Sequence, residues 1–139
     1  MPSEQELFDE LSFYTLAHGD PAFIHENAAD AWRAQQANET TKPMAVVFAV
    51  MGLYLYIEKG FTGKQVQRAH MRMARGRRSW PQLALPTERG RITVADVVAA
   101  KPGMERDAMI RRWCEAVWET WQESRPQIME LARAELGVD

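Results

Sequence analysis

The feature that most constrains the fold is an uncharged run of fourteen residues, from Met44 to Ile57, that holds only apolar and aromatic side chains and one glycine. At about 100° per residue, these side chains would surround a helix on every side. A helix that is apolar all round is buried in protein or in a membrane. This run would rise only about 21 Å, less than a bilayer core of about 30 Å. The sequence therefore predicts a buried central helix and no membrane span.

Signals at both ends of the run favour a helix over a buried strand, and fourteen residues also exceed the usual length of a strand. Thr41 is the expected N-cap, Pro43 falls in the first turn, and Gly60 follows the last turn. Gly52 lies in the middle, where glycine costs about 1 kcal/mol relative to alanine. We expect a neighbouring helix to pack closely against Gly52.

Apolar residues at helical spacing predict further helices on both sides of the central one. Residues 76–92 are expected to lack regular structure and to be held on the bundle by apolar side chains such as Trp80 and Leu83. With 139 residues, the chain is expected to form one all-α domain, a bundle of six or seven helices around residues 44–57. The flanking helices are expected at 4–17, 21–38, 63–75, 94–100 and from about 104 to 136, the last kinked or restarted at Pro126.

The expected helix at 21–38 has two faces of different character. It should begin at Pro21, with Asp20 as its N-cap. Its inner face is expected to hold Ile24, Ala28, Ala31, Trp32 and Gln35, and its outer face Glu26, Asp30, Arg33 and Ala37.

Cysteine usage and the N-terminus bear on the compartment. The single Cys114 cannot form an internal disulfide, and no cysteine-rich metal motif is present. The first residues are acidic, unlike those of a secretory signal peptide. We therefore expect a cytoplasmic protein.

The net charge of −2 hides an uneven distribution of charge along the chain. Residues 1–58 carry nine acids and two bases, whereas residues 59–87 carry seven bases and no acid. A basic segment between acidic flanks could bind an anion, a partner or nucleic acid. The other interpretation is that the basic segment is attracted to the acidic residues 1–58, within one chain or across a homodimer. The candidate anion- or partner-binding residues are Arg68, Arg72, Arg75, Arg77, Arg78 and Trp80.

The three histidines form the second candidate site. His18, His25 and His70 each fall on or beside an inward helix face. Histidine with a carboxylate suits divalent transition metals such as zinc, iron, nickel or manganese. Asp20 and Glu26 are candidate carboxylates, and Glu58 at the end of the central run completes the predicted metal set. No Glu-x-x-His or His-x-x-x-His signature is present, so ordinary core histidines remain the alternative.

Several segments of the sequence resemble those of an uncharacterised bacterial family of small helical proteins, a domain of unknown function. They are residues 18–25 (HGDPAFIH), 52–55 (GLYL), 60–71 (GFTGKQVQRAHM) and 92–97 (ITVADV). The resemblance covers most of the chain and implies a helical fold. It implies no activity and no catalytic residue.

Three functions remain open from the sequence. The first is a non-enzymatic interaction module that uses the arginine-rich stretch 64–80 to bind a protein partner or a small anionic ligand. The second is a metal-dependent enzyme or metal-binding protein built on the histidines, and the third is a nucleic-acid binder. Whether the chain is an enzyme is left open.

Overall fold

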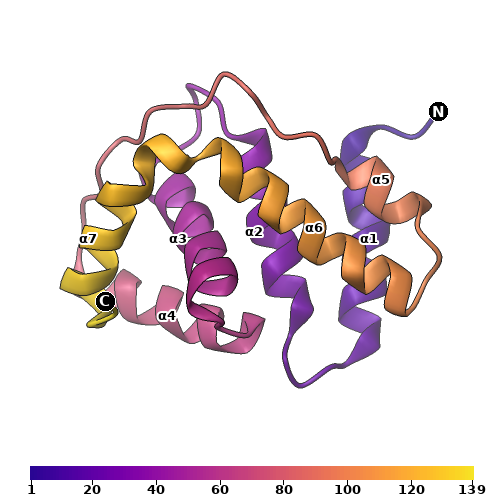
Figure 1. Ribbon diagram of the computed structural model, residues 1–139, viewed down its shortest axis with the longest axis horizontal. Helices are drawn as coiled ribbons and strands as arrows, with labels where there is room; N and C mark the ends of the chain where they lie inside the picture. Colours follow the sequence, from indigo (N-terminus) through magenta and orange to yellow (C-terminus); the bar gives the residue numbers. More distant parts are fainter.

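The computed structural model describes all 139 residues, and every regular element in it is helical. Figure 1 shows α1 and α5 at one side of the molecule, α4 and α7 at the other, and α2 and α3 between them. The elements are α1 (Glu4–His18), α2 (Ile24–Gln36), α3 (Pro43–Lys59), α4 (Gly63–Gly76), α5 (Val94–Ala99), α6 (Met104–Thr120), a 3₁₀ turn (Gln122–Ser124) and α7 (Arg125–Leu136). The predicted all-α bundle of six or seven helices is confirmed.

Helix α3 takes the place predicted for it, but its N-cap is Lys42 and not Thr41, whose hydroxyl accepts a hydrogen bond from the Asn38 N–H instead. It packs against α2, α4, α6 and α7, and residues 49–55 are all buried. Burial is incomplete near its start, where Met44 is 44% exposed and Phe48 is only partly buried. The apolar run therefore does two things: its later turns form the core, and its first turns line a surface cavity described below.

Helix α2 differs from the prediction at its start. It begins at Ile24 and not at Pro21, although the Asp20 carboxylate does accept a hydrogen bond from the Ile24 N–H. Tertiary contacts account for the delay. The Ala22 carbonyl accepts a hydrogen bond from the Lys64 N–H at 2.9 Å. The backbone of Phe23 also lies so close to Gly63 that a Cβ added at position 63 would be 1.9 Å from the Phe23 carbonyl oxygen.

The predicted faces of α2 also need correction. Glu26, Asp30 and Ala37 were expected on an outer face, yet they are 8%, 1% and 1% exposed. Helix α2 is covered by α3, α6, α4 and α1, so little of it faces water. A periodicity argument assumes one solvated side, which this helix largely lacks.

The remaining elements follow the sequence signals closely. Ser3, Thr62 and Thr93 each form a capping box at the start of a helix. Residues 77–93 form an irregular segment that runs from α4 to α5 (Figure 1) and buries Leu83 against the core. None of the helices combines the length and the apolar character needed to cross a membrane.

Candidate functional site

A cluster of three ionisable side chains lies where α2, α3 and α4 meet. Glu26 and Asp30 come from successive turns of α2, and His70 comes from α4. One donor atom from each residue lies within 4.8 Å of the other two. Residues four apart share one face of a helix, so α2 turns both carboxylates toward α4. The cluster is the one group of three histidine, cysteine or acidic residues that this geometry brings together.

Asp30 is the most unusual member of the cluster. Its side chain is buried, and neither carboxylate oxygen has a hydrogen-bond partner. The Oε2 atom of Glu26 is also buried and unpartnered. A buried polar group without a partner costs about 1–3 kcal/mol, and more if it is charged. Three such oxygens in one place, beside an imidazole, make this cluster a candidate site for a cation.

Gly52 of α3 makes room for this carboxylate. A Cβ at position 52 would stand 1.9 Å from Asp30 Oδ2 and 2.6 Å from its carboxyl carbon. The close helix packing predicted at Gly52 is therefore confirmed, and the group that fills the space is a carboxylate. The central glycine was the sequence signal for this site, although it did not indicate which residue would face it.

His70 is held in one tautomer by α3. Its Nε2 lies 2.7 Å from the carbonyl oxygen of Phe48, which can only accept, so Nε2 carries the proton and donates. The other ring nitrogen, Nδ1, lies 3.6 Å from Glu26 Oε2. A metal-binding histidine commonly donates its second N–H to a backbone carbonyl in this way, because the bond fixes the ring orientation.

Burial shifts the pKa values of Asp30 and His70 so that their neutral forms are favoured. Burial raises the pKa of Asp30 well above its ordinary value, and the nearby Glu26 raises it further. Burial also lowers the pKa of His70, while Glu26 and the Phe48 carbonyl oppose that change. Both shifts arise because charge is costly away from water. A cation in the cluster would reverse that preference and favour ionised carboxylates.

A cavity of about 310 Å³ opens over Asp30 and His70. Half of its lining residues come from the first turns of α3, and two basic side chains come from α2 and the loop before α3. The lining residues are Asp30, Arg33, Lys42, Met44, Ala45, Phe48, Ala49 and His70. The buried cluster thus has a route to solvent through the part of α3 that the core leaves uncovered.

The four residues of the predicted metal set are placed apart from one another. His18 Nε2 lies 3.6 Å from Asp107, and His25 Nδ1 lies 2.9 Å from the Thr15 hydroxyl. Of the four, the structure places only His70 in the cluster, where it meets Glu26, which the sequence had named as a candidate carboxylate. Asp30 was missed because it was assigned to the outer face of α2.

Glu58 lies in a different environment, against α6 and α7. Its carboxylate accepts hydrogen bonds from Trp118 Nε1 at 2.8 Å and from two nitrogens of Arg125 at 2.6 and 2.8 Å. The Arg125 bonds lower the pKa of Glu58, partial burial opposes them, and the Trp118 bond adds to the lowering. With its acceptor capacity used in this way, Glu58 links α3 to the C-terminal helices.

In the arginine-rich stretch, one arginine forms an ion pair within the chain and the others form none. Arg77 pairs with Glu135 of α7 at 3.2 Å and lies over the ring of Trp80, with 5.4 Å from its guanidinium carbon to the ring centre. Trp80 itself packs edge-on against Phe48. The other arginines form no ion pair within the chain; they are Arg68, Arg72, Arg75 and Arg78.

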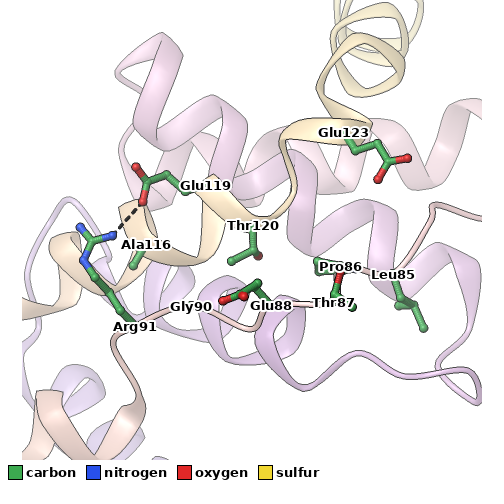
Figure 2. A pocket seen from close by; sticks show the side chains of 10 residues that line it. All are labelled: Leu85, Pro86, Thr87, Glu88, Gly90, Arg91, Ala116, Glu119, Thr120 and Glu123. Atoms are coloured by element: carbon green, nitrogen blue, oxygen red, sulfur yellow. Dashed lines mark hydrogen bonds and ion pairs between the residues drawn. The ribbon is translucent and has the colours of Figure 1, made fainter.

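A second, larger cavity of about 410 Å³ lies between the irregular segment and α6 (Figure 2). Glu88, Glu119 and Glu123 line it, and Glu119 pairs with Arg91 at 2.8 Å. The side chains of Arg91 and Glu119 are 72% and 66% exposed, so water solvates this pair. The cavity holds no buried, unpartnered group comparable to Asp30, which makes the α2–α3–α4 cluster the stronger candidate.

Comparison with known proteins identifies a family without identifying an activity. No curated protein and no solved structure matches the chain. A family model matches residues 4–122, which include α1 to α6 and the whole Glu26–Asp30–His70 cluster. The chain therefore belongs to a family of unknown function, DUF5946.

Proposed function

We propose that the chain binds one divalent transition-metal ion through Glu26, Asp30 and His70. The observation that carries the proposal is the buried Asp30 carboxylate, whose two oxygens have no donor while they face a second carboxylate and an imidazole. Divalent ions bind such donors at about 2.0–2.2 Å, which places neighbouring donors about 3–4 Å apart. A cluster that spans 4.8 Å reaches that spacing through small side-chain rotations.

The charge and type of the donors support a dication. Two ionised carboxylates and one M²⁺ sum to zero, so the occupied cluster is neutral and suits a buried place. Mixed oxygen and nitrogen donors suit manganese, iron or zinc better than the hard ions calcium and magnesium, which prefer oxygen alone. Three protein ligands leave further coordination positions for the cavity side, as in metal sites that bind a substrate.

The first test measures metal directly. Protein purified without a tag and without metal-affinity chromatography is analysed for metal content, then stripped and titrated with Mn²⁺, Fe²⁺ and Zn²⁺ by calorimetry. We expect one ion per chain. A free ion concentration 100 times Kd should stabilise the fold by about 2.7 kcal/mol.

Asp30→Asn and His70→Gln are the test variants, because each keeps the approximate size of the side chain and removes a ligand. His25→Gln is the matched control, since His25 lies outside the cluster and bonds to Thr15. Loss of binding in the first two variants alone supports the proposal. A stripped protein that takes up none of the three ions, or an Asp30→Asn protein that binds like the wild type, would overturn it.

A second role is favoured by the free arginines on α4. Arg68, Arg72 and Arg75 have no partner within the chain, and the acidic helix α1 lies away from α4 (Figure 1). Like charges at i, i+4 spacing repel one another, so an acidic surface on a partner or on a second copy would relieve them. Arg68→Glu with Arg72→Glu should change the oligomer size or partner binding, measured by sedimentation and affinity capture; no change in either would count against this role.

A further inference from the structure

Two basic side chains that form no ion pair line the cavity over the Glu26–Asp30–His70 cluster. Arg33 and Lys42 both line it, and neither forms an ion pair within the chain. Arg33 is close enough to oppose the raised pKa of Asp30 and to add to the lowering of the His70 pKa. Two unpaired bases at the mouth of one small cavity favour an anionic guest.

Apart from Arg33, Lys42, Asp30 and His70, the wall is apolar. Met44, Ala45, Phe48 and Ala49 present side chains from the first turns of α3. Met44 is 44% exposed although it belongs to the most apolar run of the chain. Apolar walls with a few placed polar groups are typical of small-molecule sites, and about 310 Å³ lies at the small end of their usual range of about 300–1,000 Å³.

From this arrangement we infer that the cavity binds a small organic anion with a compact apolar body. Its acidic group would lie between the metal ion and the cations of Arg33 and Lys42, and its apolar body would pack on Met44 and Phe48. The inference rests on the proposed metal site, because the ion supplies the deepest contact. With the two ligand carboxylates already offset by the metal, the added negative charge would be balanced by Arg33 and Lys42.

The experiment titrates three probes into the Mn²⁺-loaded protein and into the stripped protein by calorimetry. Benzoate and phenyl phosphate carry different acidic groups on the same ring, and benzamide carries none. We expect one or both anions to bind the loaded protein at least tenfold more tightly than benzamide. The preferred anion then distinguishes a carboxylate ligand from a phosphate ligand. Broadening of the NMR signals of the bound probe by Mn²⁺ would place it beside the ion.

Arg33→Met and Lys42→Met remove the charges while keeping long apolar side chains, and Arg112→Met, at an exposed position of α6 outside the cavity, is the matched control. We expect each of the first two variants to weaken anion binding about tenfold and to leave benzamide binding and Mn²⁺ stoichiometry unchanged. Arg112→Met should bind like the wild type. Circular dichroism checks that each variant folds.

The outcomes separate this inference from the metal proposal. Metal binding without anion binding at millimolar probe concentrations would overturn the inference and leave the metal site standing. Anion binding that is equal in loaded and stripped protein would overturn the contact with the ion. Equal binding of benzamide, or no loss in Arg33→Met and Lys42→Met, would overturn recognition by charge.

Discussion

Two carboxylates, Glu58 at the end of α3 and Asp30 packed against α3, differ in almost every physical respect. Glu58 is partly exposed and accepts three hydrogen bonds, two of them from the guanidinium of Arg125. Asp30 is 1% exposed and accepts none. Their pKa values move in opposite directions, because donors stabilise one charge and burial penalises the other.

The comparison teaches which acidic residue to regard as functional. A carboxylate with its acceptors satisfied joins elements of the fold, as Glu58 joins α3 to α6 and α7. A buried carboxylate without donors weakens the fold unless a ligand completes it, and perturbed groups of this kind concentrate at functional sites. The sequence favoured Glu58 as a metal ligand, whereas the contacts favour Asp30.

The largest effect should come from filling the space in which Asp30 lies. Gly52→Ala places a Cβ 1.9 Å from Asp30 Oδ2 and 3.2 Å from Val66, so the carboxylate or the α2–α3 contact must move. Alanine gains about 1 kcal/mol in helix propensity, but overpacking commonly costs about 1–3 kcal/mol. We expect a net loss of up to about 2 kcal/mol in the free energy of unfolding, measured by urea denaturation, and weaker metal binding.

Gly76→Ala is the control for this substitution. Position 76 also lies in a helix, yet an added Cβ would meet only the tip of the Glu135 side chain, at 2.9 Å. Its stability should stay close to that of the wild type. If both alanine variants behave alike, the close approach at Gly52 does not constrain Asp30.

Replacing each carboxyl group by an amide in turn should change the free energy of unfolding in opposite directions. In stripped protein kept in a chelator at neutral pH, Asp30→Asn should raise the free energy of unfolding by about 1 kcal/mol, because it removes a costly buried acid. Glu58→Gln should lower that free energy by about 1 kcal/mol or less, since the pair is partly exposed to water. A destabilised Asp30→Asn protein would indicate that Asp30 has a structural partner after all.

The contributions of Glu58 and Asp30 to stability should depend on pH in opposite ways. The lowered pKa of Glu58 means that its contribution to stability is present above its ordinary value of 4.5 and is lost as pH falls through the folded value. The raised pKa of Asp30 has the reverse effect: its contribution is present below 3.8 and is lost as pH rises through the folded value.

Denaturation of stripped wild type, Glu58→Gln and Asp30→Asn from pH 3 to pH 7 measures both trends. The advantage of wild type over Glu58→Gln should grow as pH rises toward about 4.5 and stay level above it. The advantage of Asp30→Asn over wild type should grow as pH rises. Parallel curves for all three proteins would contradict both assignments.

Local chemistry explains why most of the fold could be predicted from the sequence. The capping residues Ser3, Thr62 and Thr93 act on backbone groups within three residues, so their effect depends little on the rest of the molecule. The start of α2 depends instead on Gly63 and Lys64, about forty residues away. No local rule contains that contact, and the predicted start at Pro21 was wrong for this reason.

The candidate site was harder to predict, because its distinguishing property is the lack of contacts. Gly52 indicated a close approach, and His70 was placed on an inward face, but the pairing of Asp30 with Gly52 is set by the docking of α2 on α3. The free arginines were visible in the sequence as a charge imbalance. Which of them the fold would tie down, as it ties Arg77 to Glu135, depends on where α7 packs.

The smallest effect, close to zero, is expected for the two histidines outside the cluster. His18 is 37% exposed beside Asp107, and His25 bonds to Thr15, so His18→Gln and His25→Gln should change stability by less than about 0.5–1 kcal/mol and leave metal stoichiometry at one ion per chain. Elemental analysis of the two variants beside His70→Gln decides between a site with three histidines and a site with one histidine and two carboxylates. If His18→Gln loses metal, His18 must reach the ion by moving from its place beside Asp107, and the cluster as described here is not the metal site. If only His70→Gln loses metal, then the contrast between a satisfied and an unsatisfied carboxylate located the site that histidine spacing alone did not.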